Sequence, residues 1–393
     1  MRLAVAGAGI QGASIALELA RRGHAVDLYE REAAPFARAS SSNEGKLHLG
    51  FVYGNDPSTR TAQIVLRGSM RFREIVNRWM PFSAETVPHS DPFYYAVHRD
   101  TLVPLAALEA HFARVAAMVG EAGACTRVGS RELEQQFDPR TVQAAYRTIE
   151  RSIDPRALAA LYAKALAAEP EIRLHARHAV RRASACDDGR IALEIEHAGA
   201  LRPEVYDRVA NASWEGRLAL DRSFGLDPGR RWLHRYKLGT WLTLKENAPP
   251  ARVPSVTVVL GPFGDVAQFG GRTIYVSWYP ACLVGASDAL EPPDWKGALT
   301  DARRAEALAK SLDALGGIAP ALRSLGEVER RETIGGVIFA WGASGIDDPA
   351  SELHTRYDIG VLSRGHWHSV NTGRYCTAPL FALEACDRML GER

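Results

Sequence analysis

A short apolar strand followed by a glycine-rich turn opens the chain, and this segment limits the possible folds most strongly. The turn has the sequence GAGIQG over residues 7–12, and a helical pattern follows over residues 13–22. A second apolar strand over residues 25–29 ends at an acid, Glu30. Strand, glycine-rich turn, helix, strand and acid in this order are typical of the βαβ unit of a dinucleotide-binding domain.

The glycines and the acid of this unit each have a physical role in holding a dinucleotide. Gly7 permits the tight turn, Gly9 lets the backbone approach a pyrophosphate, and Gly12 allows the helix to pack closely on the strand. The first helical amides then face the phosphates. Glu30 can accept hydrogen bonds from a ribose diol and would repel a 2′-phosphate. The motif therefore disfavours NADP and leaves FAD and NAD.

Composition places the chain among globular proteins and argues against several classes of partner. Hydrophobic residues make up 46% and charged residues 24% of 393 residues, enough for roughly two domains. The formal net charge of +2 does not indicate a nucleic-acid partner. The five cysteines are odd in number and form no C-x-x-C pair, so they predict neither a disulfide framework nor a metal site. No apolar run is long enough to span a bilayer, and a cytoplasmic location is expected.

The pattern of elements predicts two domains built from separated segments. Ile153-Asp154-Pro155 opens a helix over residues 156–168, in which Asp154 can cap the first turn and Pro155 suits its first position. Between residues 231 and 285, β-branched and aromatic runs bounded by Gly and Pro predict a mainly antiparallel sheet.

The resulting fold class is α/β, or α+β overall, with a Rossmann-like nucleotide domain and an inserted β-sheet domain. The nucleotide domain is expected over residues 1–80, 148–220 and 328–393. The substrate domain is expected over residues 81–147 and 221–327.

Four segments resemble the D-amino-acid oxidase superfamily of FAD-dependent oxidoreductases. They are the serine-rich run at residues 39–48, Ile153-Asp154-Pro155, the turn at residues 209–214, and the segment GRYCTAP at residues 373–379. Within the superfamily, these segments resemble those of glycerol-3-phosphate dehydrogenase, L-2-hydroxyglutarate dehydrogenase and glycine or sarcosine oxidase. The sequence departs from the pattern at Ser213, where the family has a glycine.

The resemblance implies FAD as the cofactor. It also implies transfer of a hydride to flavin N5 from a C–N or C–O carbon of a small amine, amino acid or 2-hydroxy acid. Oxygen or another acceptor would then reoxidise the flavin. With the βαβ motif, it predicts these cofactor-binding residues: Gly7, Gly9, Ile10, Gln11, Gly12, Glu30, Arg31, Ser40, Ser41, Asn43, Gly45, Lys46, Val180, Ala212, Ser213, Gly373, Arg374, Tyr375 and Thr377.

Three residues are the candidates for catalysis. His48 matches the flavin-adjacent histidine of the family and can act as a base, orient the substrate or carry a covalent flavin link. Tyr275 lies on an apparent strand and can line the substrate site, although aromatic residues there also suit an ordinary sheet core. Arg235 is one of three arginines, with Arg272 and Arg331, that can clamp a substrate carboxylate or remain surface charges.

The sequence alone leaves other functions open. An FAD-dependent monooxygenase shares the N-terminal unit, and a non-catalytic flavin-binding protein would share the whole cofactor motif. An NAD-dependent dehydrogenase would leave residues 40–45 and 373–379 unexplained. The histidines His366 and His368 have no carboxylate at a metal-binding spacing, so no metal is expected, and Cys376 is expected to be a buried, unreactive thiol. The sequence does not indicate an oligomeric state.

Overall fold

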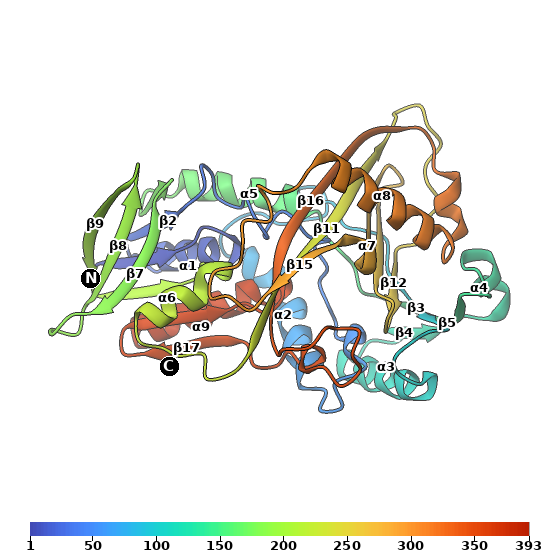
Figure 1. Cartoon of the computed structure of the whole chain (residues 1–393), viewed down its shortest axis with the longest axis horizontal. Coiled ribbons are helices and arrows are strands. Elements are labelled where there is room, and N and C mark those ends of the chain that lie inside the picture. The colour runs from blue at the N-terminus through green and yellow to red at the C-terminus, as the bar shows by residue number, and fades with distance from the viewer. Residues whose placement is uncertain (393) are drawn as a thin grey trace.

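A computed structural model describes residues 1–392, and it divides into two sheet-based halves that lie side by side along the long axis (Figure 1). One half contains a six-stranded sheet in the order β17-β18-β10-β1-β2-β6. All pairings in it are parallel except that between β17 and β18. Its strands are β1 Leu3–Ala6, β2 Val26–Glu30, β6 Ile172–Ala176, β10 Arg208–Asn211, β17 Gly360–Arg364 and β18 Trp367–Asn371.

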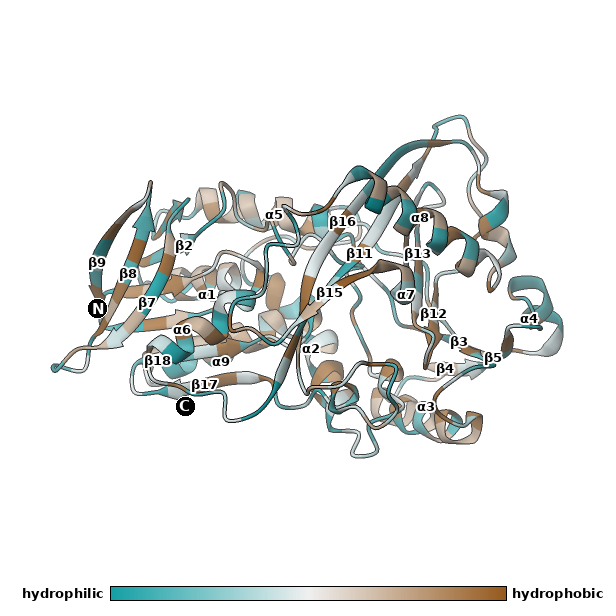
Figure 2. Ribbon diagram, in the orientation of Figure 1, coloured by the Kyte–Doolittle hydropathy of each residue, from teal (hydrophilic) through white to brown (hydrophobic). Residues whose placement is uncertain are grey.

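Both faces of this parallel sheet are covered, as a buried parallel sheet requires. Helices α1 (Ile10–Arg21), α5 (Pro155–Ala168) and α9 (Ala378–Leu390) pack together with the sheet residues in one apolar core. A three-stranded antiparallel sheet of β7 (Ala179–Ala185), β8 (Ile191–His197) and β9 (Ala200–Tyr206) covers the other face. Hydrophobic and hydrophilic residues alternate along β8, because only one face of this small sheet is buried (Figure 2).

The second half is built on a larger sheet in the order β15-β11-β14-β13-β12-β3-β5-β4, with β16 paired to β11. Its pairings are antiparallel except that between β12 and β3. Its strands are β3 Tyr94–His98, β4 Cys125–Arg127, β5 Val142–Thr148, β11 Trp232–Leu244, β12 Val256–Val259, β13 Gly264–Phe269, β14 Thr273–Trp278, β15 Leu283–Ser287 and β16 Val328–Trp341.

The remaining helices flank this sheet or join the two halves, except α6, which packs on β7 and β18 in the first half. These are α2 Arg60–Val76, α3 Leu105–Val119, α4 Ser130–Gln136, α6 Arg217–Ser223, α7 Tyr279–Cys282 and α8 Asp301–Gly316. Short 3₁₀ turns lie at η1 Phe51–Tyr53, η2 Trp214–Gly216, η3 Pro320–Ser324, η4 Glu352–His354 and η5 Tyr375–Thr377. None of the helices in the described part of the chain is long and apolar enough to cross a bilayer.

The predicted α/β class with a Rossmann-like domain is confirmed, and the predicted cap of α5 is present. Asp154 accepts hydrogen bonds from the backbone amides of Arg156 and Ala157. Residues 172–176 form β6 at the edge of the parallel sheet, and β7 then starts the small antiparallel sheet.

Strand β16 belongs to a different half of the fold from the one that the sequence predicts. It lies within residues 328–393, which the sequence assigns to the nucleotide domain, yet it pairs with β11 along almost its whole length. Its hydrogen bonds therefore place it in the sheet of the second half. The chain returns to the parallel sheet only at β17.

Candidate active site

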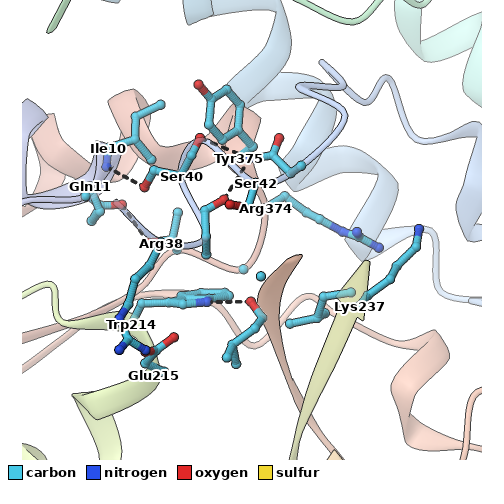
Figure 3. Close-up of a pocket in the computed structure, with 18 of the residues that line it drawn as sticks. Ile10, Gln11, Arg38, Ser40, Ser42, Trp214, Glu215, Lys237, Arg374 and Tyr375 are labelled. Carbon is cyan, nitrogen blue, oxygen red and sulfur yellow. Dashed lines mark hydrogen bonds and ion pairs between the residues drawn. The ribbon is translucent and has the colours of Figure 1, made fainter. Parts of the chain in front are cut away.

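A cavity of about 340 Å³ extends from the glycine-rich turn of the nucleotide domain to the sheet of the second half. Figure 3 shows Ser40 beside Ile10 and Gln11, with Lys237 and Arg374 extending toward another side of the same pocket. Fifteen of the predicted cofactor residues line it: Gly7, Gly9, Ile10, Gln11, Glu30, Arg31, Ser40, Asn43, Lys46, Val180, Ala212, Ser213, Gly373, Arg374 and Tyr375. The predicted catalytic residues His48, Tyr275 and Arg235 line it as well.

The N-terminus of α1 opens onto one end of the cavity. The Ser40 hydroxyl accepts a hydrogen bond of 2.9 Å from the Ile10 amide, which fixes the serine-rich loop against the first turn of the helix. Gly12 does not line the cavity, and its role is packing: a Cβ there would lie 1.8 Å from the Gly7 carbonyl oxygen. First-turn amides have no partner within their own helix, so they are available to an anion.

Glu30 lies at the end of β2 beside this turn and is nearly buried. Its two carboxylate oxygens accept hydrogen bonds of 2.9 Å from the amides of Ala8 and Glu32. Burial raises the pKa of Glu30, and these two backbone hydrogen bonds oppose that rise. The carboxylate is thus held in one orientation and keeps acceptor capacity for the diol of a ribose.

Two arginines and two acids form an ion-pair network along the same end of the cavity. Arg31 pairs with Glu215, and Arg38 pairs with both Glu215 and Glu32. Figure 3 shows Arg38 and Glu215 together at the rim of the pocket. Arg31 therefore lines the cavity with its charge already neutralised.

The serine-rich loop contains two predicted cofactor residues that do not line the cavity. The Ser41 hydroxyl donates a hydrogen bond of 2.7 Å to the Phe36 carbonyl. Gly45 has φ +65°, and a Cβ there would lie 1.9 Å from the Ile153 carbonyl oxygen. Both residues shape the loop that carries Ser40 and Asn43.

The C-terminal segment lies against the start of α1. The hydroxyl of Thr372 is 3.1 Å from the side-chain oxygen of Gln11 and within hydrogen-bonding distance. Thr377 is fully buried and does not line the cavity, since its hydroxyl donates to the carbonyl of Arg374 at 2.6 Å. It stabilises the turn that presents Gly373, Arg374 and Tyr375 to the cavity.

His48 is buried in the wall of the cavity next to a buried acid. Its Nδ1 atom lies 3.6 Å from the Glu150 carboxylate, which also accepts hydrogen bonds from the Leu49 amide and the Tyr95 hydroxyl. Burial lowers the pKa of His48 below its ordinary value of 6.5, and Glu150 opposes this effect. His48 is therefore neutral at neutral pH and can accept a proton.

Lys46 is buried, and its charge is compensated within the protein. Its ammonium group lies 2.7 Å from Asp265 and also contacts Thr257 and the face of Phe93. Lys237 lies 3.7 Å from the other oxygen of Asp265. Burial alone would raise the pKa of Asp265, but the two lysines lower it. Lys46 thus lines the cavity as half of an ion pair with β13.

The far end of the cavity contains arginines that do not pair with acids. Arg235 on β11 is buried and donates a hydrogen bond of 2.9 Å to the hydroxyl of Tyr279. Arg356, which the sequence analysis did not single out, is also buried and lines the same cavity. No motif marks this residue, because it follows η4 in an irregular segment.

Several residues considered from the sequence lie away from the cavity. Arg272 binds the Lys245 carbonyl at 2.7 Å, and Arg331 lies on β16 outside the lining. His366 is exposed, while His368 on β18 hydrogen-bonds Ser363 on the neighbouring strand β17. Cys376 is buried, and burial raises the pKa of its thiol to about 11, as expected of an unreactive cysteine.

The nucleotide end of this cavity fits FAD. Gly9 allows the serine-rich loop to approach the turn, since a Cβ there would lie 2.8 Å from the Ser40 hydroxyl, and the buried amide nitrogen of the Gln11 side chain has no partner in the described chain. The same cavity continues past Gly373 to His48 and the second sheet, so a dinucleotide bound at α1 can extend to the polar far end. Fold and cavity together define a dinucleotide-dependent enzyme.

Comparison with protein families gives the class a name. Residues 2–368 match the DAO family, described as FAD dependent oxidoreductase, and the chain belongs to this family. Its cofactor is FAD.

Solved structures of several flavoenzymes share the fold over the whole chain. Glycine oxidase from Geobacillus kaustophilus has a TM-score of 0.72 at 16% identity, with 100% of this chain and 95% of that chain covered. Iminodiacetate oxidase from Chelativorans sp. BNC1 has a TM-score of 0.68 at 17% identity, covering 100% and 96%. L-Proline dehydrogenase from P. horikoshii has a TM-score of 0.68 at 14% identity, covering 100% and 94%.

One curated relative matches over a short segment. A bifunctional protein of tRNA 5-methylaminomethyl-2-thiouridine biosynthesis from Shewanella amazonensis is 37% identical over 81 residues. The match covers 20% of this chain and only 12% of that protein.

Proposed function

We propose that this FAD-dependent oxidoreductase oxidises the C–N bond of a small amine or amino acid, producing an imine. The observation that carries the proposal is one continuous cavity, which joins the FAD-binding turn to a buried far end lined by His48 and Arg235. Three proteins of similar fold are named for glycine, iminodiacetate and L-proline, which all contain an amine. These names favour amines over 2-hydroxy acids. The electrons would pass to oxygen or to another acceptor.

The residues of the far end have complementary roles in such a reaction. The flavin, when bound, supplies the hydride acceptor. Arg235 would bind a substrate carboxylate, because a guanidinium offers parallel N–H donors that match a carboxylate. Tyr275 and Tyr279 form the wall beside it and exclude water.

His48 would take the proton that the substrate amine loses. Glu150 lies on the Nδ1 side of the ring and favours the tautomer with a proton at Nδ1, which leaves Nε2 as the acceptor. Since burial keeps the imidazole neutral, this role needs no prior deprotonation at neutral pH.

The remaining cofactor residues would hold FAD along its length. The amides after Gly9 would contact the pyrophosphate, Glu30 the ribose, and Gly373 to Tyr375 the isoalloxazine ring. Cytoplasmic location is our proposal on the composition of the chain, chiefly its five cysteines without a paired motif.

Anaerobic flavin bleaching tests the reaction directly. The purified protein should be yellow, and amino acids or N-methyl amines should bleach the flavin while 2-hydroxy acids do not. Bleaching only by 2-hydroxy acids would transfer the proposal to C–O oxidation. Bleaching only by NAD(P)H would favour a monooxygenase, and a protein that does not take up FAD would contradict the whole assignment. A His48→Asn variant should bind FAD normally and be reduced about 100-fold more slowly, as expected for loss of a general base.

A further inference from the structure

The far end of the cavity holds more positive charge than the protein neutralises. Arg235 and Arg356 are 2% and 7% exposed, and Arg374 lies beside them in the lining. Within residues 1–392, none of these three guanidinium groups has a carboxylate within 4.0 Å. Other buried cations of this chain are paired: Lys46 with Asp265 at 2.7 Å, and Arg217 with Asp221 at 3.1 Å.

Each of the three arginines also has a buried nitrogen without a hydrogen-bond partner in the described chain. These atoms are Nε of Arg235, Nη1 of Arg356 and Nε of Arg374. Their other contacts are neutral: Arg235 donates to the Tyr279 hydroxyl, Arg356 donates to the Leu353 carbonyl at 3.1 Å, and Arg374 lies over the Tyr53 ring. Buried charges without partners are costly, so this arrangement requires a ligand that supplies negative charge.

The three arginines line the same cavity, and the positive charges of Arg374 and Arg235 act on Arg356. Burial lowers the pKa of Arg356 well below its ordinary range, and Arg374 and Arg235 lower it further. The acids that act on Arg235 and Arg374 from a distance are Asp347 and Glu44, and Asp347 is exposed. Neither forms an ion pair with them among the described residues.

One of the three arginines belongs to the cofactor segment. Arg374 lies between Gly373 and Tyr375, which the turn of residues 372–377 presents toward the start of α1. Its charge suits the anionic reduced flavin. Arg235 on β11 and Arg356 after η4 lie outside the cofactor segments and remain for the substrate. A single carboxylate between them would leave one buried positive charge unneutralised.

We infer that the substrate carries two anionic groups, so that Arg235 and Arg356 each bind one. The substrate class is a small amine or amino acid with two carboxylates, and this inference rests on the proposed amine oxidation. An amine with one carboxylate would satisfy only one of them.

Ligand binding to the FAD-loaded protein tests this inference without requiring turnover. Thiodiacetate and methylthioacetate are a matched pair of thioethers that differ in one carboxylate and carry no oxidisable amine. Titrations at constant ionic strength would follow the flavin spectrum. Thiodiacetate should bind roughly 10- to 100-fold more tightly, the range for one added charge-assisted hydrogen bond. Equal affinities would overturn the inference.

Substitutions assign the effect to the arginines. Arg356→Gln and Arg235→Gln each replace a charged contact by a neutral one. Each variant should therefore bind thiodiacetate less than roughly threefold more tightly than methylthioacetate. Arg330→Gln is the control, because Arg330 is exposed on β16 and pairs only with Glu332. A preference that survives in both cavity variants would contradict the inference. Thermal denaturation checks folding, and the wild-type preference stands as a test even if a variant fails to fold.

Substrate oxidation provides a second readout that separates the two proposals. Iminodiacetate should reduce the flavin with a higher kcat/KM than N-methylglycine, and aspartate with a higher value than 2-aminobutyrate. Reduction by both members of each pair at equal rates would overturn the dianion inference and leave amine oxidation intact. Failure of every amine, with a persistent preference for thiodiacetate, would overturn amine oxidation and support the dianionic site.

Discussion

Replacing Gly12 by alanine should separate the packing role of the glycine turn from direct contact with FAD. Gly12 lies in the first turn of α1 and does not line the cavity, so any loss of FAD must act through the backbone. A Cβ at this position would lie 1.8 Å from the Gly7 carbonyl oxygen and 3.0 Å from its carbon. This is about 1.5 Å closer than an ordinary non-bonded contact.

The magnitude follows from which atoms can move. The clashing oxygen belongs to the backbone of the turn, whose Gly7 has φ +96° and is itself packed against Ala212 and Ser213. Inserting a methylene into a packed site costs about 1–3 kcal/mol, and rigid surroundings place this case at the upper end. If this cost destabilises the FAD-bound conformation by about 3 kcal/mol, the affinity for FAD drops roughly 100-fold, since about 1.4 kcal/mol corresponds to a factor of ten in affinity.

FAD titration of the apoprotein, followed by flavin absorbance, measures this affinity, and urea unfolding measures stability. Gly129→Ala is the matched control, because Gly129 has φ −70° and no neighbouring atom within 4 Å of its Cβ position. A Gly12→Ala variant that binds FAD as tightly as the control would refute the reasoning from close packing.

Three further changes test other parts of the site. Asp265→Asn should lower the free energy of unfolding by about 3–5 kcal/mol in urea denaturation, because it leaves the buried Lys46 without its counter-charge; an unchanged midpoint would contradict this. The acid limb of the pH profile of kcat/KM should lie below pH 6.5, since burial lowers the pKa of His48. Glu150→Gln should move this limb to still lower pH, because Glu150 raises that pKa. A limb that moves to higher pH in this variant would contradict the prediction. Glu30→Ala should weaken FAD binding by roughly tenfold, the loss of about one hydrogen bond to a charged group; unaltered FAD affinity in the same titration would remove Glu30 from the ribose site.

Local signals account for what the sequence predicts well. The βαβ unit combines a strand, a turn and a helix within thirty residues, and α1 starts at Ile10, three residues before the expected start. The cap of α5 by Asp154 depends on residues two and three positions away.

Sheet membership is less accessible from the sequence, because it depends on long-range pairing. Residues 328–341 read as part of the nucleotide domain from their position in the chain. They join β11, which is almost one hundred residues earlier, and that pairing is set by tertiary packing.

Charge compensation explains why the substrate end is the hardest part to predict. Lys46 and Arg235 are both buried cations of the cavity wall, and the acid nearest to Lys46 in the sequence, Glu44, is not the one that pairs with it. Lys46 meets Asp265 only because the loop after residue 45 lies against β12 and β13. Arg235 meets a tyrosine instead, so it stays available to a ligand. Both cations are buried, yet Lys46 has a structural role and Arg235 can bind a ligand. The difference lies in whether the residue that faces the cation is an acid. A site of this kind can be recognised only when the partners of every buried charge are known.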